Sequence, residues 1–126
     1  DENNIDFFAY SPLSFGILCI DPDKEENKEK SFIRNSLFEN YKKPTYELRR
    51  CLKRIAHQRS VSQAQVAINW CCYQGTIPLV GMRKKSQVID VSNVFNWNLK
   101  KNEFKVLQEV SKKCLKKMPK NPFSSN

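Results

Sequence analysis

Two short apolar segments, separated by long helical patterns, constrain the fold most strongly. Residues 5–10 (Ile-Asp-Phe-Phe-Ala-Tyr) are aromatic and mostly apolar and stop at Ser11-Pro12, and residues 76–80 form a second short run that ends at Gly81. Both runs are typical of buried strands. Long helical connections favour parallel pairing, because antiparallel neighbours need only a short turn. The pattern predicts an alternating α/β architecture, and two strands alone cannot satisfy the edges of such a sheet, so the chain is expected to be part of a larger one.

Helical periodicity predicts the elements between and after these strands. A short helix is expected over 31–38, a longer one over 45–58 after Pro44, and another from Ser86 through Phe95. The helix over 45–58 is predicted to bury Leu48, Leu52, Ile55 and Ala56 and to expose Arg49, Arg50, Lys53 and Arg54. The last helix, over 101–117, is predicted to place Phe104, Leu107, Val110, Cys114 and Leu115 on one side.

The helix expected over 63–73 has the clearest boundaries. Ser62 and Gln65 have capping-box spacing, in which the hydroxyl accepts an amide hydrogen and the glutamine side chain reaches back to the cap. Gly75 is a natural C-terminal stop. Apolar residues, Cys71 and Cys72 among them, cover nearly the whole circumference, so this helix is predicted to pack on several sides.

Length, charge and cysteine content limit the class of protein. The 126 residues fit one domain, and 22 Lys and Arg against 13 Asp and Glu give a net charge of +9, which favours phosphate-bearing or polyanionic partners. Five cysteines without a CxxC pair, together with one histidine, fit neither a disulfide framework nor a zinc site, so a cytoplasmic or other reducing compartment is expected. Neither a secretory signal nor a membrane-spanning run is recognised. Residues 21–30 are expected to form a surface loop and 119–126 a C-terminal tail.

Two turns carry chemistry that suits a phosphate-bearing ligand. Residues 81–86 (Gly-Met-Arg-Lys-Lys-Ser) precede a predicted helix, so free amides, the positive end of the helix dipole and three cations converge there. Residues 10–16 place Tyr10 at a strand end, followed by small residues whose amides allow a close phosphate approach. The alternatives are a solvated basic turn for the first, and a core tyrosine followed by an ordinary turn for the second.

The sequence resembles the aldo-keto reductases. Residues 9–16 (AYSPLSFG), 62–70 (SQAQVAINW) and 75–81 (GTIPLVG) are similar to consecutive signatures of that family, in the same order and spacing, and residues 87–90 and 97–99 extend the likeness. It is closest to the plant-type reductases and more distant from the potassium-channel β subunits. The resemblance implies that residues 1–126 are the C-terminal portion of one NADP-dependent domain, the C-terminal half of a (β/α)8 TIM barrel. Residues 5–10 and 76–80 would be its last two strands, whose C-terminal ends face the active site.

The same resemblance assigns an NADP(H) site. Tyr10 would stack on the nicotinamide, while Gly81, Arg83 and Lys84 would hold the adenosine 2′-phosphate. The other residues implied are Ser11, Pro12, Leu13, Ser14 and Gly16 around the pyrophosphate, Arg34 on the phosphates, and Gln87 and Asp90 at the adenine and ribose. Val91 and Ser86 stand where the family usually has asparagine and a basic residue.

The implied reaction is hydride transfer from NADPH to an aldehyde or ketone. The family's catalytic aspartate, tyrosine, lysine and histidine belong to the N-terminal half and match no segment here, so no catalytic or metal-binding residue is assigned and the chain alone is expected to be inactive. His57 lies among arginines in a helix and is expected to be a surface residue. The expected partners are a carbonyl substrate and the N-terminal half of the barrel, or a second copy of the chain. A non-catalytic NADPH-binding subunit is the alternative; a nucleic-acid-binding module is less favoured because the lysines are spread out.

Overall fold

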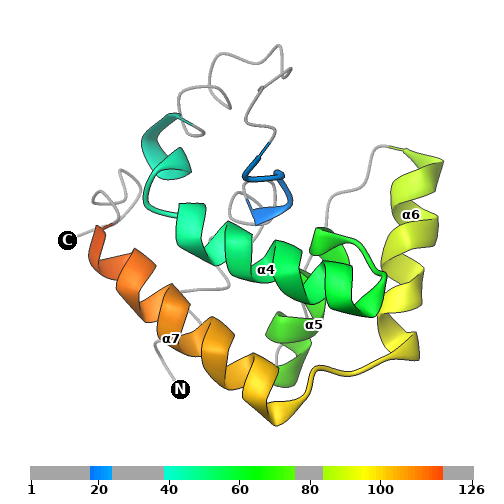
Figure 1. The fold of residues 1–126 in the computed structure, drawn as a ribbon. Helices are drawn as coiled ribbons and strands as arrows, with labels where there is room; N and C mark the ends of the chain where they lie inside the picture. The colour runs from blue at the N-terminus through cyan, green and yellow to red at the C-terminus, as the bar shows by residue number, and fades with distance from the viewer. Residues whose placement is uncertain (1–17, 24–38, 76–83, 118–126) are drawn as a thin grey trace.

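The computed structural model describes residues 18–23, 39–75 and 84–117, which form a cluster of helices (Figure 1). Its elements are α4 (Tyr46–Arg59), α5 (Gln63–Tyr73), α6 (Lys85–Ser92), the 3-10 helix η1 (Asn93–Asn96) and α7 (Lys101–Lys117). No strand lies within these ranges. The predicted strands over 5–10 and 76–80, the short helix over 31–38 and the tail over 119–126 fall outside the described residues, as does most of the loop over 21–30.

The core lies where α4 packs against both α5 and α7 (Figure 1). Leu52, Val66 and Leu107, one from each helix, are completely buried. The predicted stripe of α4 is confirmed, since Leu48, Leu52, Ile55 and Ala56 are all buried. Burying apolar side chains from three helices against each other is the main source of stability in a cluster of this size.

Arg49 is the exception on α4, because the prediction that it is exposed is wrong. Its side chain is fully buried. The Arg49 Nε–H donates to Thr45 Oγ1 at 3.2 Å and Nη2 donates to the Lys42 carbonyl at 2.6 Å. The guanidinium is therefore paired with the turn before the helix, which offsets the cost of removing a charge from water.

The boundaries predicted for α5 are confirmed at both ends. The Ser62 hydroxyl accepts the Gln65 backbone N–H at 3.1 Å, and Gly75, with a φ of +84°, donates its N–H to the Cys72 carbonyl just after the helix ends. The second half of the predicted capping box is wrong, because the Gln65 side chain turns away from the cap toward Asp90 and Trp97. Buried residues surround most of α5, as predicted, but Cys72 is exposed.

The predicted range of α7 is also confirmed, although its buried face differs slightly. Leu107, Ser111 and Cys114 are buried, whereas Leu115 is 55% exposed, contrary to the prediction. Leu115 lies one residue beyond Cys114, about 100° further around the helix. Phe104 is partly buried and stacks on Tyr73 with 4.2 Å between ring centroids, which connects α7 to the C-terminal end of α5.

The predicted helix from Ser86 through Phe95 is divided in two. The first part, α6, begins one residue earlier than predicted, at Lys85, and ends at Ser92. The 3-10 helix η1 follows it directly. α6 lies at the edge of the cluster, where none of its residues is buried (Figure 1). Val94 of η1 is buried, whereas Phe95 is 84% exposed. None of the described helices combines the length and apolar character that crossing a membrane requires.

Candidate functional site

The predicted cofactor residues are divided between described and undescribed parts of the chain. Lys84, Gln87 and Asp90 are described and lie at the N-cap and in the first two turns of α6. The remainder fall outside the described residues: Tyr10, Ser11, Pro12, Leu13, Ser14, Gly16, Arg34, Gly81 and Arg83. The geometry of the candidate site is therefore the geometry of the α6 N-terminus.

Lys84 is the N-cap residue of α6 and has an extended backbone (φ −120°, ψ 144°). The Gln87 side chain folds back over the cap, where its Oε1 accepts the Lys84 backbone N–H at 3.2 Å. The N–H groups of Gln87 and Val88 donate to the Lys84 carbonyl. Lys84 and Gln87 are thus brought together at one helix end, with Gln87 orienting the backbone that carries the lysine.

The end of α6 has the electrostatic character of an anion site. Lys84 and Lys85 are both exposed and adjacent. The Gln87 N–H in the first turn already donates to the Lys84 carbonyl, and the helix dipole places partial positive charge at this end of α6. An exposed lysine pair at the positive end of a helix suits a phosphate group that arrives from solvent.

Asp90, the third described residue, forms hydrogen bonds with residues at the start of α5. The Ser62 hydroxyl donates to Asp90 Oδ2 at 2.5 Å, and the Gln65 side-chain amide donates to Asp90 Oδ1 at 2.9 Å. Ser62 is the N-cap of α5, and Gln65 lies in the first turn of that helix. The carboxylate therefore connects α6 to the N-terminus of α5, an interaction that sequence reasoning missed.

Polar residues on α5 supply the signal that could have revealed this connection. Gln65 and Asn69 are buried although most of the helix around them is apolar. The Asn69 amide donates to the Val94 and Trp97 carbonyls at 3.3 and 2.8 Å, and its oxygen accepts the Leu99 N–H at 3.2 Å. A buried polar group needs a partner, so Ser62, Gln65 and Asn69, on one side of the helix, mark the face that receives α6 and the segment after it.

Cysteine and histidine are the described residues that could act as a nucleophile or a base. Burial raises the pKa of the Cys71 thiol to about 12, so its thiolate is scarce at neutral pH. His57 is exposed on α4, as predicted. Within the described ranges, no three histidine, cysteine or acidic residues are grouped so that they could hold a metal ion.

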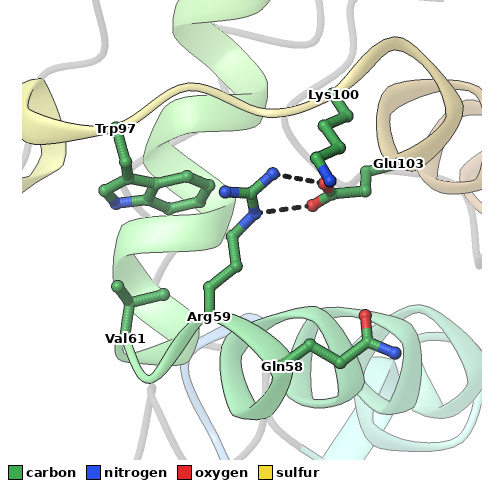
Figure 2. A pocket seen from close by; sticks show the side chains of 6 residues that line it. All are labelled: Gln58, Arg59, Val61, Trp97, Lys100 and Glu103. Atoms are coloured by element: carbon green, nitrogen blue, oxygen red, sulfur yellow. Dashed lines mark hydrogen bonds and ion pairs between the residues drawn. The ribbon is translucent and has the colours of Figure 1, made fainter.

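A pocket of about 350 Å³ lies where the end of α4 meets the start of α7 (Figure 2). Its lining residues are Gln58, Arg59, Val61, Trp97, Lys100 and Glu103. Arg59 Nε donates to Glu103 Oε2 at 2.9 Å, Nη2 pairs with Oε1, and the guanidinium lies 4.9 Å from the centroid of the Trp97 ring. Figure 2 shows Arg59 between the indole and the carboxylate.

The pocket contains none of the predicted cofactor residues, and its main cation is already paired. The hydrogen bonds from Arg59 lower the pKa of the Glu103 carboxyl, which keeps the ion pair intact at neutral pH. We therefore interpret this pocket as a polar junction between helices and place the candidate site at α6.

Comparison with known proteins addresses the family directly. The model of the aldo/keto reductase family matches residues 1–112. The chain is 32% identical over 125 residues to a protein of Arabidopsis thaliana named "Pyridoxal reductase, chloroplastic", and the match covers 99% of this chain but 34% of the relative. The chain thus spans about a third of the length of that relative. No solved structure matches. The resemblance read from the motifs is confirmed: the chain belongs to the aldo/keto reductase family.

Proposed function

We propose that this chain is the cofactor-binding, C-terminal part of an NADPH-dependent oxidoreductase that reduces aldehydes or ketones. Family membership and a reductase relative support the reaction class. The observation that carries the cofactor assignment is the N-terminus of α6, where the exposed lysines Lys84 and Lys85 lie at the positive end of the helix dipole. In a family of reductases, an anion site of this kind fits the phosphate that distinguishes NADPH from NADH.

The described residues fit the adenosine end of the cofactor. Lys84 would pair with the 2′-phosphate, and the Lys85 and Ser86 backbone amides would donate to its oxygens. Gln87, which holds the backbone of Lys84, lies one turn into α6, close enough to approach the adenosine as well. Arg83 directly precedes Lys84, Gly81 lies three residues before it, and both would complete the proposed phosphate loop. Bound NADPH would supply the hydride for the carbonyl carbon.

The nicotinamide end of the proposed site rests on residues outside the described ranges. Tyr10 would stack on the nicotinamide, Ser11, Pro12, Leu13, Ser14 and Gly16 would surround the pyrophosphate, and Arg34 would reach the phosphates. In the proposed (β/α)8 barrel, the C-terminal ends of the strands over 5–10 and 76–80 would lie at the same face. The turns that follow these two strands would therefore both contact one cofactor. The proton-donating residues would come from the N-terminal half of the barrel, and residues 1–126 alone are expected to show no turnover.

The remaining N-terminal half is also the partner we propose for this chain. Val88, Ile89 and Phe95 are 48%, 57% and 84% exposed on α6 and η1. Apolar side chains at these positions would be covered by the other barrel elements, or by a second copy where those are missing. A reducing compartment remains the proposed location, because Cys51, Cys71 and Cys114 are buried free thiols.

Cofactor binding by the natural full-length polypeptide tests the proposal. We expect NADPH to bind more tightly than NADH, and Lys84→Ala to weaken NADPH binding about fivefold, or roughly 1 kcal/mol, while NADH binding stays unchanged. The measurement is titration calorimetry with each cofactor, followed by an assay with pyridoxal as a first aldehyde.

Lys112→Ala is the matched control, because Lys112 is also an exposed lysine and lies on α7 rather than at the candidate site. It removes the same charge and is expected to leave NADPH affinity unchanged. The proposal fails if neither nicotinamide cofactor binds, or if Lys84→Ala and Lys112→Ala have equal effects.

A further inference from the structure

The placement of α6 depends on few contacts, although this helix carries the proposed phosphate site. None of its residues is buried, and Val88 and Ile89 face solvent. Val91 is only partly buried against the core. Besides the packing of α6 on η1, the hydrogen bonds of Asp90 connect α6 to α5 among the described residues.

This connection is well formed on the carboxylate side. Each Asp90 oxygen accepts one hydrogen bond, Oδ2 from the Ser62 hydroxyl at 2.5 Å and Oδ1 from the Gln65 amide at 2.9 Å. Hydrogen bonds to an ionised carboxylate are about twice as strong as neutral ones. Ser62 is also the N-cap of α5, so the negative charge lies at the positive end of the α5 dipole.

The Gln65 side chain is itself fixed in the orientation that Asp90 needs. Gln65 is 5% exposed, and its Oε1 accepts the Trp97 indole N–H at 3.0 Å. An indole nitrogen can only donate, so the amide oxygen must face Trp97 and the amide nitrogen must face Asp90. The two hydrogen bonds therefore run in one direction, from the Trp97 N–H to the Gln65 oxygen and from the Gln65 amide nitrogen to Asp90.

We propose that Asp90 is a positioning residue for the cofactor's 2′-phosphate and acts through Ser62 and Gln65 on the direction of α6. This inference rests on the proposed function. Asp90 holds α6 in the orientation in which the amides of α6 and Lys84 bind the phosphate. The polar face of α5 fixes that orientation because it supplies the hydrogen-bond donors to Asp90. A site held loosely by its supporting residues loses affinity even when every ligand-contacting residue is present.

Substitution of Gln65 separates positioning from direct contact, because Gln65 lies on α5 and not on the cofactor-binding helix. In the full-length polypeptide, Gln65→Met keeps the side-chain length and removes both the hydrogen bond to Asp90 and the one accepted from Trp97. We expect it to weaken NADPH binding about tenfold, the consequence of losing one charge-assisted hydrogen bond. Asp90→Asn should cause a similar loss, and the double variant should be little weaker than either single variant because both remove the same interaction.

Gln63→Met is the matched control on the same helix. The Gln63 amide donates to the Leu18 and Ile20 carbonyls and not to Asp90. Its NADPH affinity should remain within about twofold of the unmodified protein, since its hydrogen bonds lie outside the Asp90 connection. Thermal melting establishes that each variant is folded, and Ser62→Ala, which also removes a donor to Asp90, replaces Gln65→Met if the latter does not fold.

The outcomes distinguish the alternatives. Loss of NADPH affinity in Asp90→Asn but not in Gln65→Met or Ser62→Ala would show that Asp90 contacts the cofactor directly, and additive losses would show two independent roles; either result overturns the inference. Unchanged affinity in all of these variants does the same. Failure of the unmodified protein to bind NADPH would contradict the proposed function instead.

Discussion

Among single residues, Arg59 shows how a polar side chain can join three segments of the chain. Its guanidinium pairs with Glu103 of α7 and stacks on Trp97. The side chains of Arg59 and Glu103 are 22% and 13% exposed, so both charges are partly removed from water. Each charge then depends on the other, and the loss of one partner is expected to cost more than the loss of an exposed ion pair.

Glu103→Gln tests this dependence through pH. The pKa of Glu103 is lowered by its hydrogen bonds with Arg59, so its contribution to stability is complete above the ordinary carboxyl pKa and is lost as pH falls through the lowered value. At pH 7 we expect Glu103→Gln to reduce the free energy of unfolding by about 2 kcal/mol. The difference from the unmodified protein should shrink as pH falls from about 5 toward 3.

Urea denaturation at several pH values provides the measurement, and Glu109→Gln, at an exposed position on the same helix, is the control. A difference that stays constant over this pH range would exclude the ion pair as its source.

Individual residues also show what could and could not be predicted from the sequence. Lys84 was predicted in the turn before a helix that begins at Ser86, and the structure places it at the N-cap of α6, which begins at Lys85. Arg49 and Gln65 were assigned to the wrong surroundings, because local spacing does not show which distant carbonyls, carboxylates or indoles lie within reach. Their partners include Lys42 and Thr45 for Arg49, and Asp90 and Trp97 for Gln65.

At the scale of helices, local signals predicted the boundaries well and the buried faces slightly less well. α5 begins and ends as predicted because Ser62 and Gly75 act locally. The transition from α6 to η1 was not predicted, and neither were the hydrogen bonds that Asn69 of α5 donates to the carbonyls of Val94 and Trp97. Features that depend on contacts between residues distant in the sequence could not be predicted from the local pattern.

Leu52→Ala tests which face of α4 contributes to stability. Leu52 is completely buried between helices, and its truncation should reduce the free energy of unfolding by about 3 kcal/mol because it leaves a cavity. Leu115→Ala removes the same atoms from an exposed position and should change stability by less than about 0.5 kcal/mol. Chemical denaturation of both variants is the measurement, and equal losses would contradict the observed packing.

For the molecule as a whole, the family could be predicted from the motifs, and the comparisons confirm it. The expected strands over 5–10 and 76–80 lie outside the described residues, so the barrel stays a proposal that family membership supports. The chain corresponds to about a third of its plant relative's length, and the proposed activity depends on elements beyond that third. What the helical cluster contributes is a well-packed support of α4, α5 and α7 for the exposed helix α6.

The most direct test of this account is a crystal structure of the full-length polypeptide with NADPH. We predict that the 2′-phosphate lies within about 3 Å of the Lys84 Nζ and the first amides of α6, with Asp90 still bound to Ser62 and Gln65. A cofactor bound with its 2′-phosphate away from α6, or a crystal grown at saturating NADPH that contains none, would contradict the assignment of the α6 N-terminus as the phosphate site.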